Sequence, residues 1–167
     1  MNAGLDTKRA LVDVLLQRLE TELETMRRAA RDAREAATHE EAKPENDKDT
    51  RALEASYLAG AQAARVREIE AAIKLIGAMQ LLDLSGGKTI QASAVVTVED
   101  EDETRTTFFV APFGGGTSVE ARGQAVQVLT PQSPLGRALL GHAEGDGIEV
   151  PAKGRAKPRE MTIVSVW

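Results

Sequence analysis

The sequence has no cysteine, few aromatic residues and no long apolar run. Without cysteine, the chain forms no disulfide, no thiolate nucleophile and no cysteine-ligated zinc site. No apolar run approaches the roughly 20 residues that a membrane-spanning helix needs. The first apolar stretch contains Asp6 and Asp13 and has no evident cleavage site, unlike a secretory signal. These absences predict a cytoplasmic protein without membrane contact.

The chain also lacks an excess of basic residues. It has 21 Lys and Arg residues against 26 Asp and Glu residues, which gives a net charge of −5. Wrapping of duplex nucleic acid is therefore not expected, although local basic patches are compatible with this balance. With 28% charged and 42% hydrophobic residues, the 167 residues suit one or two folded domains rather than a disordered chain.

Glycine and proline are almost missing from the first half, where apolar residues recur at steps of three and four. This is the period of an amphipathic helix with a heptad-like seam. The first such stretch, from about Leu5 to Ala37, has Glu22 as its polar break and carries Val12, Leu15, Leu19, Met26, Ala29 and Ala33. The second, from about Asp49 to Asp83, carries Leu53, Tyr57, Gly60, Ala64, Ile69, Ile73 and Ile76.

Two long helices joined by a short polar segment predict an antiparallel hairpin. About 30 residues per arm at about 1.5 Å each give a rod of roughly 45 Å. Small residues gather near the bend, and they predict a close approach of the helices there: Ala29, Ala30, Ala33, Ala36 and Ala37 against Ala59, Ala61, Ala63 and Ala64. The larger Leu and Ile residues at the open end are expected to hold the rod together.

The pattern changes at Ser85-Gly86-Gly87, a helix stop that marks a domain boundary. Short strand-like runs follow, at residues 94–98, 106–111, 125–130, 147–150 and 161–166. One helix is expected near Pro134–Gly141, with Ser133 as N-cap, Pro134 at the first helical position and Gly141 past the end. The predicted fold class is α+β: a coiled-coil hairpin at residues 1–84, then a small domain at residues 85–167 with a bent antiparallel sheet and one helix.

Residues 128–167 contain a motif of many fixed positions, TPxSPhGxALhGxxxGD, where h is apolar. The matching residues are Thr130, Pro131, Ser133, Pro134, Gly136, Ala138, Leu139, Gly141, Gly145 and Asp146. This motif resembles the C-terminal part of the Gre family of bacterial transcription elongation factors. The order of a helical hairpin before such a domain extends the resemblance over nearly the whole chain. It implies an FKBP-like fold for the second domain, used for docking rather than for isomerase activity.

The resemblance implies a factor that binds bacterial RNA polymerase at its secondary channel and inserts the hairpin. Acidic residues at the hairpin tip then help to hold Mg²⁺ and a water at the polymerase active site, where the backtracked RNA 3′ end is hydrolysed. Such a factor is no enzyme alone, has no cofactor of its own and is expected to be a monomer. The docking residues implied are Ser133, Pro134, Gly136 and Arg137.

The segment HEEAKPENDKD at residues 39–49, between the two predicted helices, is the candidate tip, and five of its eleven residues are acids. It is similar to the family's GDLKEN tip if Glu41 and Glu45 stand for the acid pair and Asn46 for the asparagine. Pro44 is inserted there and prevents a helix from running through. Asp47 and Asp49 are alternative contributors, and Asp49 is equally a candidate N-cap.

Two less specific interpretations of this segment stay open: a solvated turn, and a tip that enters the channel and blocks it without supporting cleavage. A third hypothesis for the whole chain is a peptidyl-prolyl isomerase or chaperone with a helical arm. The few aromatic residues argue against the apolar pocket that an isomerase needs.

Four arginines precede the tip, Arg27, Arg28, Arg31 and Arg34. They are candidates for contact with the RNA 3′ end or with polymerase acids, or they form an exposed face balanced by Asp32 and Glu35. Among the remaining features, Glu99–Glu103 is expected to form a solvated hairpin loop, and Gly114–Gly116 a turn rather than a phosphate loop. Trp167 is expected at the sheet edge or on the docking surface.

Overall fold

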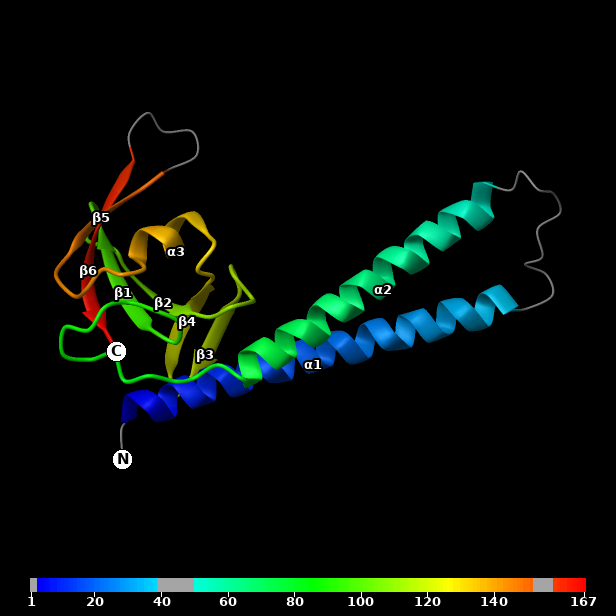
Figure 1. Ribbon diagram of the computed structural model, residues 1–167, viewed down its shortest axis with the longest axis horizontal. Coiled ribbons are helices and arrows are strands. Elements are labelled where there is room, and N and C mark those ends of the chain that lie inside the picture. Colours follow the sequence, from blue (N-terminus) through cyan, green and yellow to red (C-terminus); the bar gives the residue numbers. More distant parts are fainter. Residues whose placement is uncertain (1–2, 39–49, 152–157) are drawn as a thin grey trace. The chain divides into compact units, whose positions relative to one another are not determined.

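The computed structural model describes residues 3–38, 50–151 and 158–167, with side chains for all of these except 34–38 and 50–56. In chain order, the elements are α1 (Ala3–Thr38), α2 (Thr50–Gly77), β1 (Val95–Asp100), β2 (Arg105–Val110), β3 (Ser118–Ala121), β4 (Gln124–Leu129), α3 (Pro134–Leu139), β5 (Gly147–Val150) and β6 (Arg159–Val166) (Figure 1). A helical hairpin followed by a sheet domain with one helix confirms the predicted α+β class. Among the described residues, no helix is long and apolar enough to cross a membrane.

The chain divides into two compact units. One comprises Met1–Leu16 with Leu75–Trp167, and the other comprises Gln17–Lys74. The first four turns of α1 therefore belong to the unit that contains the sheet. The predicted domain boundary between residues 84 and 85 follows the change of sequence pattern and stays a prediction.

The two helices are long because their sequences contain almost no helix breaker. The 36 residues of α1 correspond to about 54 Å and the 28 residues of α2 to about 42 Å. The second helix ends at Gly77, six residues before the predicted end at Asp83. Glycine destabilises a helix interior, and Leu84 is needed elsewhere: it is buried in the core of the sheet domain. The expectation of a helix through residues 78–83 was wrong for that reason.

The hairpin is held together by large apolar residues at its open end, as predicted. Within the unit Gln17–Lys74, the buried large side chains are Leu19, Leu23 and Ile69. The sequence analysis put Glu22 in the apolar series as its polar break, but the buried residue at this point of the seam is its neighbour, Leu23. Tyr57 was expected in the seam, but 72% of it is exposed.

The small residues nearer the bend do not form a close contact between the helices. Ala29, Ala33, Ala59, Ala61, Ala63 and Ala64 are all exposed. Ala30 is half-buried, and the side chains of Ala36 and Ala37 lie outside the described set. For the alanines with described side chains, the prediction of a tight approach was wrong. Alanine permits a short interhelical distance, but it buries too little area to enforce one.

The sheet of the second domain has six strands in the order β3-β4-β2-β1-β6-β5. All neighbouring pairs are antiparallel except β2 and β4, which run parallel with Phe109 opposite Val128. The sheet is thus mixed, which corrects the expectation of a wholly antiparallel sheet. Strand β3 was missed because its four residues follow the glycine-rich turn and include Ser118 and Glu120. The FKBP-like assignment stays a prediction.

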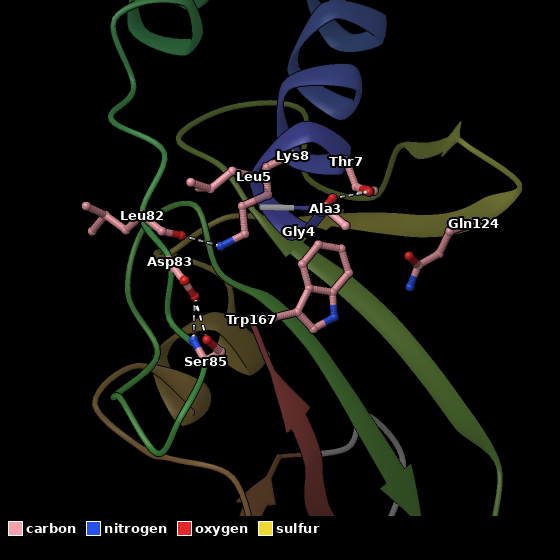
Figure 2. A pocket seen from close by; sticks show the side chains of 10 residues that line it. All are labelled: Ala3, Gly4, Leu5, Thr7, Lys8, Leu82, Asp83, Ser85, Gln124 and Trp167. Atoms are coloured by element: carbon pink, nitrogen blue, oxygen red, sulfur yellow. Dashed lines mark hydrogen bonds between the residues drawn. The ribbon is translucent and has the colours of Figure 1, made fainter. Parts of the chain in front are cut away.

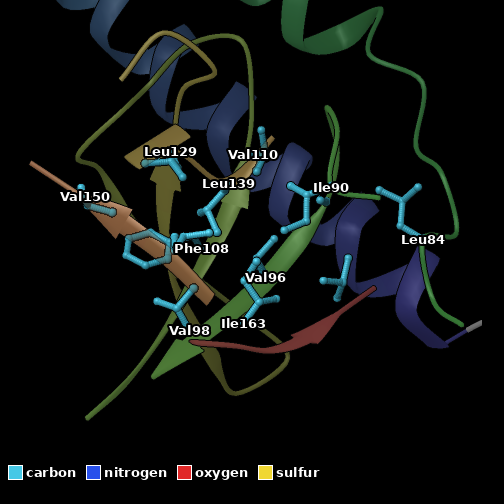
Figure 3. Close-up of a cluster of buried hydrophobic side chains, with 13 residues drawn as sticks. Leu84, Ile90, Val96, Val98, Phe108, Val110, Leu129, Leu139, Val150 and Ile163 are labelled. Atoms are coloured by element: carbon cyan, nitrogen blue, oxygen red, sulfur yellow. The ribbon is translucent and has the colours of Figure 1, made fainter. Parts of the chain in front are cut away.

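One face of the sheet packs around α3 and forms the main core (Figure 3). Leu139 of α3 is fully buried among side chains of five strands. These include Val96, Val98, Phe108, Val110, Leu129, Ile148, Val150 and Ile163. Because side chains alternate along a strand, Val95 and Phe109 point to the other face, where they too are fully buried.

The start of α1 belongs to this same unit and buries Leu11 and Leu15. A Cβ built on Gly114 would lie 3.7 Å from a methyl carbon of Leu15, so the glycine turn after β2 approaches α1 closely. Gly114 has a φ of +88° and Gly116 of +84°, backbone conformations that favour glycine. The predicted turn at residues 114–116 is confirmed.

Candidate functional site

The acidic segment with Glu41, Glu45, Asp47 and Asp49 lies outside the described residues. The structure defines its flanks: α1 ends at Thr38 and α2 begins at Thr50. The segment therefore joins the far ends of two helices that are several turns long. The assignment of these four acids as residues that assist Mg²⁺ chemistry stays a prediction.

Three of the four arginines before this segment have described side chains; these are exposed, and two of them make ion pairs. Arg27 Nη2 lies 2.6 Å from Glu70 Oε1 on α2, and Arg31 Nη2 lies 3.5 Å from Glu24 Oε1 on α1. The carboxylates that pair with Arg27 and Arg31 are thus not that of Asp32, which the sequence suggested, and the side chain of Glu35 lies outside the described set. Arg28 is also exposed. Arg34 lies within α1, and its side chain is outside the described set.

A further arginine, which the sequence analysis did not single out, bridges the two helices. Arg65 of α2 donates a hydrogen bond to Glu22 of α1 at 2.9 Å and another to Glu68 at 2.9 Å. The hydrogen bonds to Glu22 and to Glu68 raise the pKa of Arg65 above its already high usual value. The polar break at Glu22 is therefore used for an ion pair between the two helices, as is Glu70, which pairs with Arg27.

The predicted docking residues surround the start of α3, and two of them build the turn that leads into it. Ser133 Oγ donates to the carbonyl of Thr130 at 2.8 Å and accepts from the amide of Gly136 at 3.0 Å. This confirms Ser133 as the N-cap and Pro134 at the first turn of the helix. A Cβ on Gly136 would lie 2.0 Å from the Thr130 carbonyl oxygen, so only glycine fits there.

Pro134 and Arg137, by contrast, are exposed on α3. They are the two predicted docking residues whose side chains a partner can reach directly. Ser133 and Gly136 act on the shape of this surface through the turn. Gly141 follows the helix with a φ of +82°, as predicted for the residue past its end.

The least expected side chain of the molecule is Lys8, which has an exposed fraction of only 1%. Its Nζ donates a hydrogen bond to the carbonyl oxygen of Leu82 at 2.6 Å and lies 5.9 Å from the ring centre of Trp167 (Figure 2). The amide of Leu82 donates in turn to Ser93 Oγ at 3.0 Å. Ser93 is fully buried and has a φ of +70°. This chain of polar contacts ties the start of α1 to the segment that leads into the sheet.

Burial lowers the pKa of Lys8 to about 8, and the nearby Asp83 carboxylate offsets part of that effect. Trp167 continues the pairing of β6 with β1, through hydrogen bonds in both directions with the backbone of Val95 at 2.8 and 3.0 Å. Its ring lies beside an opening of about 470 Å³ that Lys8 also lines. Trp167 is thus found over a buried cation at the end of an internal strand, not at a sheet edge.

The acidic run Glu99–Glu103 begins within β1, whose last two residues are Glu99 and Asp100, and its remaining residues lie in the predicted hairpin turn to β2. Asp100 Oδ1 accepts from the amides of Thr104 and Asp102, each at 3.0 Å, and Arg159 donates to its other oxygen at 3.0 Å. The backbone hydrogen bond from Thr104, followed by the contacts with Asp102 and Arg159, lowers the pKa of Asp100. These carboxylates therefore serve the turn. Within the described ranges, no group of three or more His, Asp and Glu residues is arranged to hold a metal ion.

Residues 85–167 match the family model described as the C-terminal domain of the transcription elongation factors GreA and GreB. These residues include β1 to β6 and α3, and hence the turn built by Ser133 and Gly136. The match covers the motif on which the resemblance was based.

Curated relatives extend the similarity to the hairpin. Transcription elongation factor GreA of Rhodospirillum rubrum is 31% identical over 157 residues, which are 89% of this chain and 92% of that protein. GreA of Jannaschia sp. is 33% identical over 101 residues, 60% of each chain. A solved structure of the transcription factor Gfh1 aligns over 90% of this chain and 92% of its own, with 22% identity and a TM-score of 0.40. On the match at residues 85–167 and the near full-length similarity to GreA, the chain belongs to the GreA/GreB family of transcription elongation factors.

Proposed function

We propose that this elongation factor binds RNA polymerase at its secondary channel as a monomer and stimulates cleavage of backtracked RNA. The observation that carries the proposal is the position of the acidic segment: it joins the far ends of α1 and α2 in a chain of the GreA/GreB family. The nuclease activity belongs to the polymerase. The factor itself contributes carboxylates and a way to deliver them.

The hairpin has the properties that delivery requires. A two-helix rod is narrow, and α2 alone is about 42 Å long. The buried side chains of Leu19, Leu23 and Ile69 hold the helices in one register, and the Arg65–Glu22 pair adds a weaker contact between them. Such a rod carries a loop at its end into a channel without folding back.

The proposed role of Glu41 and Glu45 is to share a Mg²⁺ ion with the polymerase. Asp47 and Asp49 are alternative contributors. The donor set fits the ion, because Mg²⁺ prefers hard carboxylate oxygens. When bound, the ion supplies Lewis-acid stabilisation of the charge that develops during hydrolysis. The carboxylates of Glu41 and Glu45, or those of Asp47 and Asp49, would hold the ion.

The docking function is assigned to the domain formed by residues 85–167, with Pro134 and Arg137 as the exposed residues of α3. Arg27, Arg28, Arg31 and Arg34 are proposed to approach the 3′ end of the RNA. For Arg27 and Arg31 this requires competition with Glu70 and Glu24, their present partners. A solvent-exposed ion pair contributes under about 1 kcal/mol, so a phosphate group can displace it.

The test is transcript cleavage in purified backtracked complexes of the cognate polymerase, with wild type, Glu41→Ala/Glu45→Ala and Asp47→Ala/Asp49→Ala. Loss of one positioned acid pair should lower the stimulated rate by at least about tenfold. Asp13→Ala/Glu20→Ala is the matched control, because it removes two exposed acids from α1. If stimulation is lost in one of the two tip variants and kept in the other, the acids replaced in the inactive variant are the ones that act.

Binding without any stimulation by wild type would refute the cleavage function and leave a factor that blocks the channel. Pro44, which lies between Glu41 and Glu45, makes this outcome informative, because it alters the spacing found in the family motif. The isomerase hypothesis is not favoured by the family comparison.

A further inference from the structure

The two helices leave an open groove between them in the part of the hairpin nearer the bend. Its volume is about 720 Å³, and all of its lining residues belong to the unit Gln17–Lys74. From α1 come Glu24, Arg27, Ala30, Arg31 and Ala33, and from α2 come Leu58, Ala59, Gln62, Ala63, Val66 and Arg67.

This part of the hairpin lacks a core of its own. Among the side chains described at positions 24–33 and 57–68, none is buried. Leu58 has an exposed fraction of 62% and lines the groove. Two helices in water derive their stability from a buried apolar face, and here the apolar residues between them are left open to solvent. The groove therefore offers apolar surface that an occupant would cover.

The charges around the groove select the occupant. Its polar rim has three arginines, Arg27, Arg31 and Arg67, and one glutamate, Glu24. Arg27 and Arg31 are held in exposed ion pairs with Glu70 and Glu24, so acidic residues of an occupant have to displace these weak pairs. A second copy of this chain is disfavoured, because a symmetric contact through the same groove would place arginines against arginines. Single-stranded RNA would satisfy the arginines but would leave Leu58, Val66 and the alanines without an apolar partner.

The shape of the groove favours a helix over a strand. It extends over ten residues of each helix, a rise of about 14 Å, and the small side chains of Ala30, Ala59 and Ala63 in its lining leave room for large side chains. A helix satisfies its own backbone hydrogen bonds, whereas a strand would need a partner edge that a pair of helices does not provide. A helix laid into such a groove uses apolar residues at positions i, i+3 or i+4, and i+7.

We propose that the groove between α1 and α2 binds an amphipathic helix of a partner protein, with an apolar stripe over the alanines and acidic residues facing Arg27, Arg31 and Arg67. The bound helix completes a three-helix packing, so it occupies the hairpin only outside the channel that the two-helix rod enters. This interaction does not depend on the acids at residues 39–49 or on RNA cleavage.

The probe for this proposal is a labelled 15-residue stapled helical peptide with a leucine stripe flanked by glutamates. A second peptide carries lysine in place of every glutamate, and a 15-nucleotide oligoadenylate represents RNA. Fluorescence anisotropy with the full chain should show at least about tenfold tighter binding of the acidic peptide than of its lysine twin.

Two substitutions of the same kind provide the matched pair. Ala63→Glu places a carboxylate inside the groove, whereas Ala61→Glu adds the same charge at an exposed position of α2 outside its lining. Ala63→Glu should weaken the binding of the acidic peptide by about tenfold, and Ala61→Glu should weaken it by less than about twofold. Circular dichroism checks that both variants keep the helix content of wild type.

Four results would overturn the proposal: no binding of the acidic peptide, equal binding of both peptides, an equal effect of the two variants on peptide binding, or tighter binding of oligoadenylate than of the acidic peptide. Sedimentation adds a fifth. A dimer that Ala63→Glu dissociates would show that a second copy covers the groove.

Discussion

Replacement of Lys8 by methionine tests whether the chain carries a buried ammonium group, and with it the account of how α1 is anchored. Methionine keeps the length and the apolar stem of the side chain. It removes the charge and the hydrogen bond from Nζ to the Leu82 carbonyl at 2.6 Å. The effect on the free energy of unfolding should depend on pH, because burial lowers the pKa of Lys8 to about 8.

The sign follows from proton linkage. Between pH 8 and about 10.5, Lys8 is protonated in the unfolded chain and neutral in the folded one, so the stability of wild type rises with pH in this window. At lower pH both states are protonated and the dependence vanishes. One pKa unit corresponds to about 1.4 kcal/mol, so the full depression is equivalent to about 3 kcal/mol. Hydration through the adjoining opening reduces the expected rise to about 2 kcal/mol.

In Lys8→Met this rise should be absent. Near pH 7, leaving the Leu82 carbonyl unpaired should lower the free energy of unfolding by about 1–2 kcal/mol, and removing the desolvated charge should raise it by a similar amount. The variant should therefore have nearly the same stability as wild type. Near pH 10.5 the wild-type penalty is gone and only the unpaired carbonyl counts. The variant should then be less stable by about 1–2 kcal/mol.

The assay is urea unfolding at several pH values, followed by the fluorescence of Trp167. This is the one tryptophan of the sequence, and its ring lies beside Lys8. Lys88→Met is the matched control, because Lys88 also donates to a backbone carbonyl, that of Asp83 at 2.7 Å, but is exposed. If Lys8→Met and wild type show the same slope between pH 8 and 10.5, Lys8 is not a buried ammonium and the reasoning fails.

Two further predictions concern the docking turn and the hairpin register. Gly136→Ala should destabilise the chain by about 2–4 kcal/mol, because its Cβ would meet the Thr130 carbonyl at 2.0 Å; Gly147→Ala, with nothing within 4 Å of its Cβ, should change the free energy of unfolding by under about 1 kcal/mol. Equal effects in urea unfolding would show that the turn relaxes around the added methyl group. Arg65→Gln should cost under about 1 kcal/mol in low salt and less at 0.5 M NaCl. A loss that is independent of salt would mean that Arg65 acts through its stem and not through Glu22 and Glu68.

Several features of the fold were predictable because they depend on local chemistry. Apolar residues at helical spacing and the lack of breakers defined α1 and α2 to within a few residues at three of their four ends. Ser133, Pro134 and Gly141 defined α3, since capping and glycine conformations involve only neighbouring residues. The motif around them also led to the family.

Other features depend on contacts between distant segments. The order of strands in the sheet decides that β2 pairs in parallel with β4 and that β3 joins the edge. The alternation of apolar and polar residues within one strand carries no information on this order. The early end of α2 at Gly77 follows from the burial of Leu84 in a core that forms from residues up to 166.

Lys8 combines a local feature that the sequence shows with a burial that depends on distant segments. Its position is part of a periodic series, because residues 8, 11, 15, 19 and 23 follow one helix face at steps of three and four. This spacing is that of the buried side of α1, but a lysine is ordinarily exposed, so the sequence analysis did not include Lys8 in its apolar series.

The helices of the hairpin, the α3 turn and the family could thus be inferred from residues close together in the chain. The burial of Lys8 under Trp167, the bridge from Arg65 to Glu22 and the open groove lined by alanines became evident in the folded molecule. The physical reason is that burial and pairing depend on which surfaces meet, and those surfaces come from segments far apart in the sequence.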